Sequence, residues 1–366
     1  MTSTLYDRFY AVNAAVTVSN SMGDITEGKS YQKIEEMYGR LDRLLPQDKA
    51  ESIRPREWGP DQVRPAHHRP PGMTEDGIER HRLMCTAIIE KGGRVTVWDL
   101  ARVWIRDINP EYFGILLGNQ DRIFYDLLKA GMAPTETGRY ADWPGFIGTC
   151  KMMLPVGLVN ACDPRQAALD ALDTGRLKDS PHRAFNFALE VCAAVAAGCA
   201  EALRPGATVE RVIGEALSHL SASPRAEVEA ALAWTGEVED VWALRPLFAE
   251  KYHNRPTSNA VEVLAAGLSI LRMVEGDTHQ AILASVNFGR DCDCISYVAA
   301  GLSAALHGLG STPREWLDIV EEELKTDPYT VSRRSLEDTA QGLYQAMLNE
   351  MERSQARIAE LQAQIR

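Results

Sequence analysis

The chain has 366 residues, of which 45% are hydrophobic and 25% charged, and its net charge is −12. This is the composition of a globular protein with a large core, and the acidic balance excludes a general affinity for nucleic acid phosphates. No stretch is apolar enough for a membrane span, and the N-terminus does not resemble a signal peptide. The seven cysteines lie mostly in apolar, helix-like surroundings, which predicts free thiols in a cytoplasmic protein.

Helical periodicity dominates the chain, and no strand alternation is convincing. Small and aliphatic side chains recur at spacings of three and four residues in a series of segments. In chain order these predict helices over about residues 78–90, 167–172, 185–203, 209–220, 226–234, 260–273 and 296–307. The segments 185–203 and 296–307 are rich in small residues, so both are expected to be central helices that approach their neighbours closely. The predicted fold class is all-α, a compact multi-helix bundle.

Residues 46–71 differ from the rest, because they combine many prolines with many charges and cannot form a continuous helix. We predict a long loop here. It could act as a lid that carries His67, His68 and Arg69, although each of these is also explained as a solvated loop residue. Two locations are also possible for His182, which could face a pocket or lie on the surface at the start of a helix.

The last segment carries an apolar stripe at alternating spacings of three and four, weakened by one serine. The stripe consists of Tyr344, Met347, Met351, Ser354, Ile358, Leu361 and Ile365. This pattern predicts a terminal helix that lies on the body, or a short coiled coil that joins two chains as a homodimer. We therefore divide the chain into one helical domain, residues 1–348, and a tail, residues 349–366.

Three segments place carboxylates beside turns or helix starts. They are residues 23–28 (GDITEG), 71–77 (PGMTEDG) and 289–294 (GRDCDC). Any one of them alone is explained by helix capping. However, Asp291 and Asp293 cannot share a face of a regular helix, whereas in a turn that leads into a helix they can converge. With Thr74, Glu75 and Asp76 they offer hard oxygen ligands from two clusters, a set that suits Mg²⁺ or Mn²⁺.

The two cysteines of the last segment, Cys292 and Cys294, are a poor zinc signal, because no second Cys/His pair with the usual spacing exists. A disulfide between them is not expected either.

The three acidic segments, in this order, resemble the ADP-ribosylglycohydrolase family. This all-helical group includes the dinitrogenase reductase-activating glycohydrolase and the ADP-ribosyl-arginine and ADP-ribosyl-serine hydrolases. Residues 21–28 (SMGDITEG) resemble the family's Gly-Asp and the Pro-x-Glu-Gly-like turn after it. Residues 74–77 (TEDG) stand where the family has Thr-Asp-Asp-Thr, and residues 151–157 (KMMLPVG) echo Met-Arg-x-x-Pro-x-Gly. Residues 289–294 match the Gly-x-Asp-Thr-Asp-Thr turn before a small-residue helix, and the likeness runs from about residue 10 to 348.

The resemblance implies a bundle of the ADP-ribosylglycohydrolase type, with a central metal-lined cleft that holds a pair of Mg²⁺ or Mn²⁺ ions. The implied metal ligands are Thr74, Glu75, Asp76, Asp291, Asp293 and Cys294. The implied catalytic residues are Glu27, Asp76 and Asp293, and Glu27 matches the family glutamate placed to act on the ribose or the leaving group. In this scheme the ions orient ribose hydroxyls and a water near the anomeric carbon, while a carboxylate handles protons.

The sequence also departs from the family pattern. Glu75 replaces an aspartate, which moves the carboxylate out by one methylene. Cys294 replaces a hydroxyl with a thiol, a poor partner for Mg²⁺, so one ligand is lost, one site is weakened or a softer ion is favoured. Residues 146–150 (FIGTC) stand where the family has a Gly-Asn-Gly-type turn that helps to shape the substrate pocket.

Two functional hypotheses follow. The first is a divalent-metal-dependent hydrolase of an N- or O-ribosyl glycosidic bond, in an ADP-ribosyl conjugate or in a smaller nucleoside-like or ribosylated metabolite. The second is a family member with impaired catalysis that binds ADP-ribose or a nucleotide, or regulates another protein. The expected partner is a small-molecule or ADP-ribosylated substrate, and neither nucleic acid nor a membrane.

Overall fold

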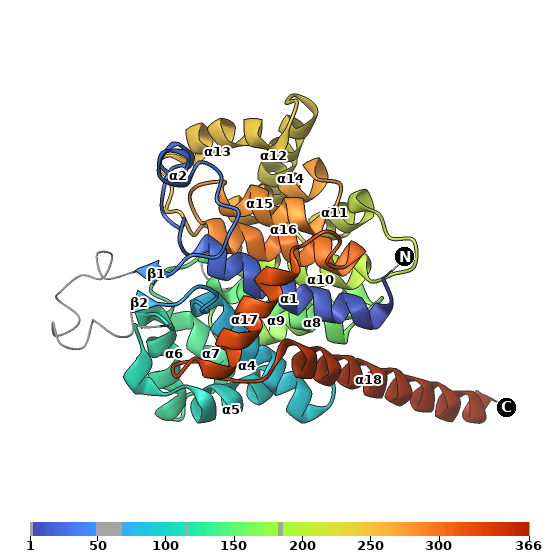
Figure 1. Ribbon diagram of the computed structural model, residues 1–366. Coiled ribbons are helices and arrows are strands. Elements are labelled where there is room, and N and C mark those ends of the chain that lie inside the picture. Colours follow the sequence, from blue (N-terminus) through green and yellow to red (C-terminus); the bar gives the residue numbers. More distant parts are fainter. Residues whose placement is uncertain (1–2, 49–67, 115, 182–185, 366) are drawn as a thin grey trace.

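The fold is described from a computed structural model, which covers residues 3–48, 68–114, 116–181 and 186–365. Almost all regular structure in these residues is helical (Figure 1), which confirms the all-α class. The elements in chain order are α1 (Leu5–Gly23), α2 (Tyr31–Tyr38), β1 (Gln47–Asp48), β2 (His68–Arg69), α4 (Asp76–Lys91), α5 (Val97–Asp107), η1 (Pro110–Tyr112), α6 (Asn119–Lys129), α7 (Pro134–Thr137), η2 (Gly138–Tyr140), η3 (Ile147–Met152), α8 (Met153–Val159), α9 (Pro164–Gly175), α10 (Ala188–Ala202), α11 (Val209–Ser218), α12 (Ala222–Ala233), η4 (Trp234–Gly236), η5 (Val241–Ala243), α13 (Leu244–Tyr252), α14 (Ala260–Met273), α15 (Thr278–Val286), α16 (Cys292–His307), α17 (Arg314–Thr326) and α18 (Leu336–Ile365).

The centre of the molecule is the pair α1 and α16, which lie side by side through the middle of the bundle (Figure 1). Every residue of α1 from position 11 to position 23 is buried, so this helix is surrounded on all sides. The small residues of α16 allow close packing, as the sequence predicts. A Cβ added at Gly301 would lie 2.3 Å from Leu154 Cδ1 and 3.2 Å from Val16 Cγ1.

The two ends of the predicted 46–71 loop pair as a short antiparallel ladder, in which Gln47 lies opposite Arg69. Residues 49–67, with His67, lie outside the described residues, and so does His182. The expectation of a solvated Arg69 is wrong, because its side chain is buried. Its buried guanidinium pairs with the buried Asp327 and donates a hydrogen bond to the Thr74 carbonyl oxygen at 2.5 Å. These partners compensate the burial of the charge.

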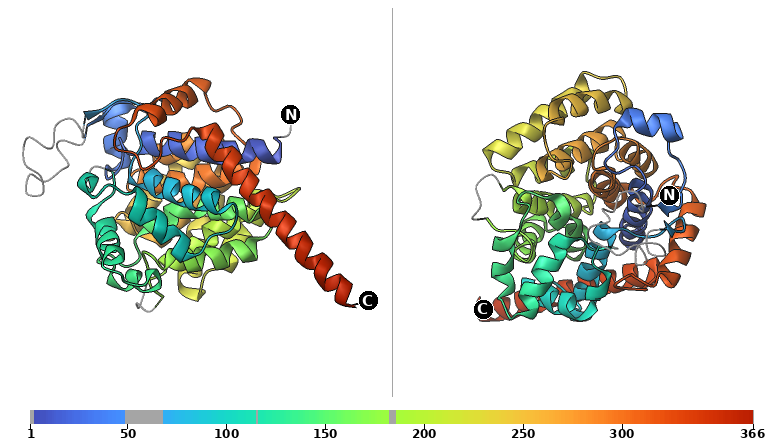
Figure 2. Two further views of the ribbon diagram at one scale, coloured as in Figure 1. Left: turned by 90° about the horizontal axis from the view of Figure 1, so that it is seen from below. Right: turned by 90° about the vertical axis from the view of Figure 1, so that its left-hand side faces the viewer.

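The last helix, α18, has two halves with different surroundings. Its first half packs on α1 and α4 and buries Leu336, Ala340 and Leu343. Its second half projects from the body in Figure 1 and in the left view of Figure 2, and residues 351–365 are exposed. Within the described residues, no helix combines the length and apolar character needed to cross a membrane.

Candidate active site

The predicted acidic segments meet where α1 ends and where α4 and α16 begin. Gly23, at the end of α1, lies against the first turn of α16, because a Cβ added there would be 2.8 Å from Asp293 Cα. The following turn is tied to the same place: Gly28 N–H donates to Arg290 O at 2.7 Å, and Arg290 N–H donates to Lys29 O at 2.9 Å. The first and third segments therefore form one packed unit.

The turn before α16 depends on two residues in the left-handed region. Gly289 has φ +92° and Arg290 has φ +64°. A side chain at Gly289 would also meet the Tyr31 backbone nitrogen at 2.8 Å, so glycine is required both for its conformation and for space. The Arg290 guanidinium is held by the buried Glu262. This anchored turn sets the register at which α16 starts.

Asp291 and Asp293 converge at the start of α16, as their spacing predicts. Asp291 is the N-cap residue, and ligand atoms of Asp291, Asp293 and Cys294 all lie within 4.8 Å of one another. Asp291 is 1% exposed, yet within the described residues neither of its carboxylate oxygens has a hydrogen-bond partner. Burial, and then the charge of Asp293, raises the pKa of Asp291 well above its usual range. The ionised form of a carboxylate in this position is costly unless a cation binds it.

Glu75 caps the start of α4. It is the N-cap residue of α4, and its two oxygens accept hydrogen bonds from Gly77 N–H at 2.6 Å and from Ile78 N–H at 2.9 Å. The extra methylene of glutamate lets the carboxylate fold back onto the helix start, so capping explains this residue. It still belongs to a second acidic group, in which oxygens of Glu75, Asp76 and Asp293 lie within 4.8 Å of one another.

A lysine that the sequence analysis did not identify lies inside this second group. Lys151, in η3, is fully buried, and its Nζ pairs with Asp293 Oδ2. The same nitrogen lies 3.3 Å from Glu75 Oε2 and donates to Asn20 Oδ1 at 2.7 Å. Its presence places a positive charge where the resemblance implies a metal ion.

Asp76 belongs to a second charge network that the sequence analysis also missed. Its carboxylate lies 2.6 Å from Arg80 Nη2, and the same guanidinium binds the buried Asp121, which also pairs with the buried Lys178 at 2.5 Å. Burial alone would raise the pKa of Asp76, but the Arg80 charge and a hydrogen bond with Glu75 lower it to about 2. The Asp76 side chain is 36% exposed, so the acidic groups open to solvent on this side.

The other two predicted site residues have different surroundings. The Thr74 hydroxyl is buried and donates to Glu79 Oε1 at 2.7 Å, so it already has a protein partner. Glu27 is exposed in the turn after α1, and it belongs to neither acidic group found among the described residues. Its catalytic role stays a prediction.

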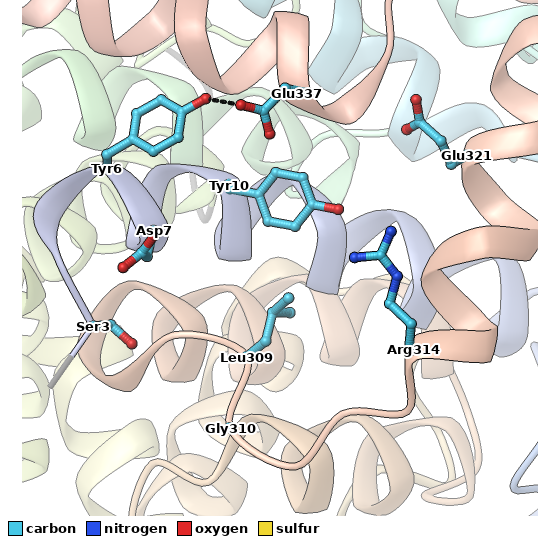
Figure 3. A pocket seen from close by; sticks show the side chains of 9 residues that line it. All are labelled: Ser3, Tyr6, Asp7, Tyr10, Leu309, Gly310, Arg314, Glu321 and Glu337. Carbon is cyan, nitrogen blue, oxygen red and sulfur yellow. Dashed lines mark hydrogen bonds between the residues drawn. The ribbon is translucent and has the colours of Figure 1, made fainter. Parts of the chain in front are cut away.

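A separate hollow of about 540 Å³ lies beside the first turn of α1, at the opposite end of this helix from the acidic groups. Figure 3 shows the hydrogen bond that the Tyr6 hydroxyl donates to Glu337, with Tyr10 between Glu337 and Arg314. None of the predicted site residues lines it. The chemistry of the acidic segments is therefore not located in this hollow.

The charges around the acidic groups are consistent with one divalent ion. Connected side chains of both signs meet there: the carboxylates of Glu75, Asp76, Asp121, Asp291 and Asp293, and the cations of Arg80, Lys151 and Lys178. When all eight groups are ionised, five negative charges against three positive charges leave two negative charges. Asp291, Asp293 and Cys294 could hold an ion that supplies this charge, whereas the group around Glu75 is already served by Lys151.

Comparison with known proteins agrees with the arrangement of these segments. The chain matches the family model described as ADP-ribosylglycohydrolase over residues 1–353. Among solved structures it is similar to one titled "ADP-ribosylglycohydrolase-related protein complex", with a TM-score of 0.61 and 20% identity over 94% of this chain and 99% of that chain, a likeness of fold. No curated protein matches the chain. Because the family model spans nearly the whole sequence, the chain belongs to the ADP-ribosylglycohydrolase family.

Proposed function

We propose that this protein is a divalent-metal-dependent hydrolase that cleaves a ribosyl glycosidic bond. Membership of the family supports a glycosidic hydrolase activity in general. The metal dependence is argued from the surroundings of Asp291. This carboxylate is buried next to Asp293 and Cys294, and no described residue forms a hydrogen bond with either of its oxygens. A bound Mg²⁺ or Mn²⁺ would polarise a water and orient ribose hydroxyls near the anomeric carbon.

In this proposal, different acidic residues bind the ion, stabilise the developing charge and transfer a proton. Asp291 and Asp293 would hold the ion from the start of α16, and Asp76 would face the substrate, since it is the most exposed carboxylate of the acidic groups. Cleavage of a glycosidic bond builds positive charge at the anomeric carbon, which a nearby ionised carboxylate stabilises. The low pKa of Asp76 keeps it ionised across the physiological range. Glu27 is proposed as the group that moves a proton, because its turn packs against Arg290.

The substrate side carries an aromatic surface next to Asp76. Trp143 and Phe146 stack with ring centroids 5.1 Å apart, and both are partly exposed. The Arg80 guanidinium, which binds Asp76, lies 5.8 Å from the Phe146 ring. Stacked aromatic rings beside a cation suit a planar heterocycle. This supports a nucleoside-like group, in an ADP-ribosyl conjugate or in a smaller ribosylated metabolite, as the substrate.

The test is a hydrolysis assay with ADP-ribosyl-arginine, ADP-ribosyl-serine and simple ribonucleosides, with Mg²⁺ or Mn²⁺ and with EDTA. We expect release of ADP-ribose or ribose only when an ion is present. Asp291→Asn should remove most of this activity and the ion-induced rise in melting temperature. Asp318→Asn, which changes an exposed carboxylate paired with Arg314, is the matched control and should alter neither. Full activity in EDTA, or in Asp291→Asn, would refute the metal-dependent mechanism.

A binding protein without turnover is the second candidate, favoured by the Lys151 ammonium inside the acidic site. The same substrates distinguish the two functions. Calorimetric binding of ADP-ribose without hydrolysis of any substrate would favour the second candidate.

A further inference from the structure

We propose that this protein holds a single divalent ion, and that the Lys151 ammonium permanently replaces the second ion of the dinuclear arrangement that the family resemblance implies. This inference rests on the proposed function and specifies its metal centre. Its basis is a set of three departures from the family motifs. Glu75 and Gly77 belong to one motif, and Lys151, which is distant from them in the sequence, lies beside both in space.

The first step concerns the position of the ammonium. Lys151 Nζ contacts Glu75 and Asp293, which are two of the three members of the group Glu75, Asp76 and Asp293. Asn20 Oδ1 accepts a further hydrogen bond from this nitrogen at 2.7 Å. The ammonium thus has three oxygen partners and no exposed surface. A divalent ion bound to the same oxygens would share its ligands with a like charge.

The second step concerns the space for the lysine side chain. A Cβ added at Gly77 would lie 1.9 Å from Lys151 Cδ and 2.3 Å from its Nζ. The family motif has a threonine at this position, and a threonine would exclude the lysine chain from its present path. The end of the Lys151 side chain would have to move to make room, and its Nζ is the atom that now contacts Asn20 and Asp293.

The third step concerns Glu75, the remaining departure. Its two oxygens are occupied by the backbone N–H groups of Gly77 and Ile78, and Oε2 also faces Lys151. A carboxylate that caps the helix and contacts an ammonium has little capacity left for a metal ion. By contrast, Asp291 on the other side is buried and without a hydrogen-bond partner among the described residues. One half of the site therefore carries its own cation, and the other half lacks one.

The test measures how many ions bind. Purified chain stripped with EDTA is titrated with Mn²⁺, and free Mn²⁺ is counted by electron paramagnetic resonance. We expect one ion per chain, with a mononuclear spectrum. A variant with the family motif restored, Glu75→Asp with Gly77→Thr and Lys151→Met, should bind two ions and show an exchange-coupled spectrum. Lys91→Met removes a lysine that pairs with a carboxylate at the far end of α4, outside this charge network, so as the matched control it should still bind one.

The outcomes separate this inference from the proposed function. Two ions in the unaltered chain, or an exchange-coupled spectrum there, would overturn the inference and leave metal-dependent hydrolysis intact. No ion in the unaltered chain would overturn both. If the triple variant does not fold, the spectrum of the unaltered chain still decides between one ion and a coupled pair.

Discussion

A buried histidine offers a quantitative test of how the helices around the site are held together. His81, in α4, is 3% exposed, and its ring nitrogens contact Tyr297 Oη and Asn13 Oδ1, both at 2.9 Å. Asn13 Nδ2 donates to Phe9 O at 2.8 Å, which fixes the amide so that its oxygen faces the ring. His81 Nε2 therefore donates to Asn13, and Nδ1 accepts from Tyr297. The neutral imidazole joins α1, α4 and α16.

Protonation of His81 should destabilise the fold. Burial, with a smaller effect of the Arg82 charge, lowers the pKa of His81 to about 3. An unfolded chain binds the proton near pH 6.5, so between these values the unfolded state carries more protons and stability falls as the pH falls. At pH 5, proton binding by this histidine shifts the folding equilibrium toward the unfolded state by a factor of about 30, which corresponds to about 2 kcal/mol by linkage. The contribution is close to zero at pH 7 and above.

The assay is urea unfolding of the unaltered chain and of His81→Gln at pH 7 and pH 5, in EDTA. The glutamine variant should lose about 2 kcal/mol less stability over this interval, because it has no proton to bind, while the carboxylates of the site titrate in both proteins. Nitrogen NMR gives an independent readout, since the imidazole should remain neutral with its proton on Nε2 at pH 5. Equal losses of stability in the two proteins, or a charged imidazole at pH 5, would refute the reasoning.

Three further predictions concern other parts of the chain. Arg69→Met leaves the buried Asp327 without its cation, so unfolding in urea should show a loss of about 3–5 kcal/mol; a loss below about 1 kcal/mol would be that of a solvated pair. Cys294→Thr supplies a hard oxygen, so Mg²⁺ affinity measured by calorimetry should rise by on the order of tenfold relative to Mn²⁺, and an unchanged ratio would exclude Cys294 as a ligand. Residues 352–366 are exposed on the single chain, and we propose that they join two chains as a homodimer through α18. Their removal should therefore give a monomer in sedimentation velocity. A truncated chain that still dimerises, or a full chain that is already a monomer, contradicts that interface.

The sequence predicts the long apolar helices well, because their patterns repeat over several turns. The segment predicted at residues 260–273 matches α14 residue for residue, and α10 and α16 also lie where small residues indicated close packing. Short elements are harder. The helix α7 has four residues and η3 has six, so neither is long enough to show apolar residues at positions i, i+3, i+4 and i+7. Their formation depends on the neighbours against which they pack.

The site was predictable only in part, for a similar reason. The convergence of Asp291 and Asp293 follows from their spacing and from the turn before them. The position of Lys151 does not, because it lies among methionines and leucine, and nothing near it in the sequence shows that Gly77 leaves room for its chain. The burial of Arg69 was missed because its partner, Asp327, comes from the distant end of α17.

The central position of α1 has a consequence for how the protein is made. This helix is synthesised well before the helix beside it, because α16 begins only at Cys292. At ordinary rates of translation the interval is on the order of tens of seconds. During that time the apolar surfaces of α1 lack their final partner and are open to association with other chains, so a chaperone that shields them should raise the yield of native protein. The acidic site joins the end of α1 to the start of α16, so it is assembled only after the start of α16 has been synthesised.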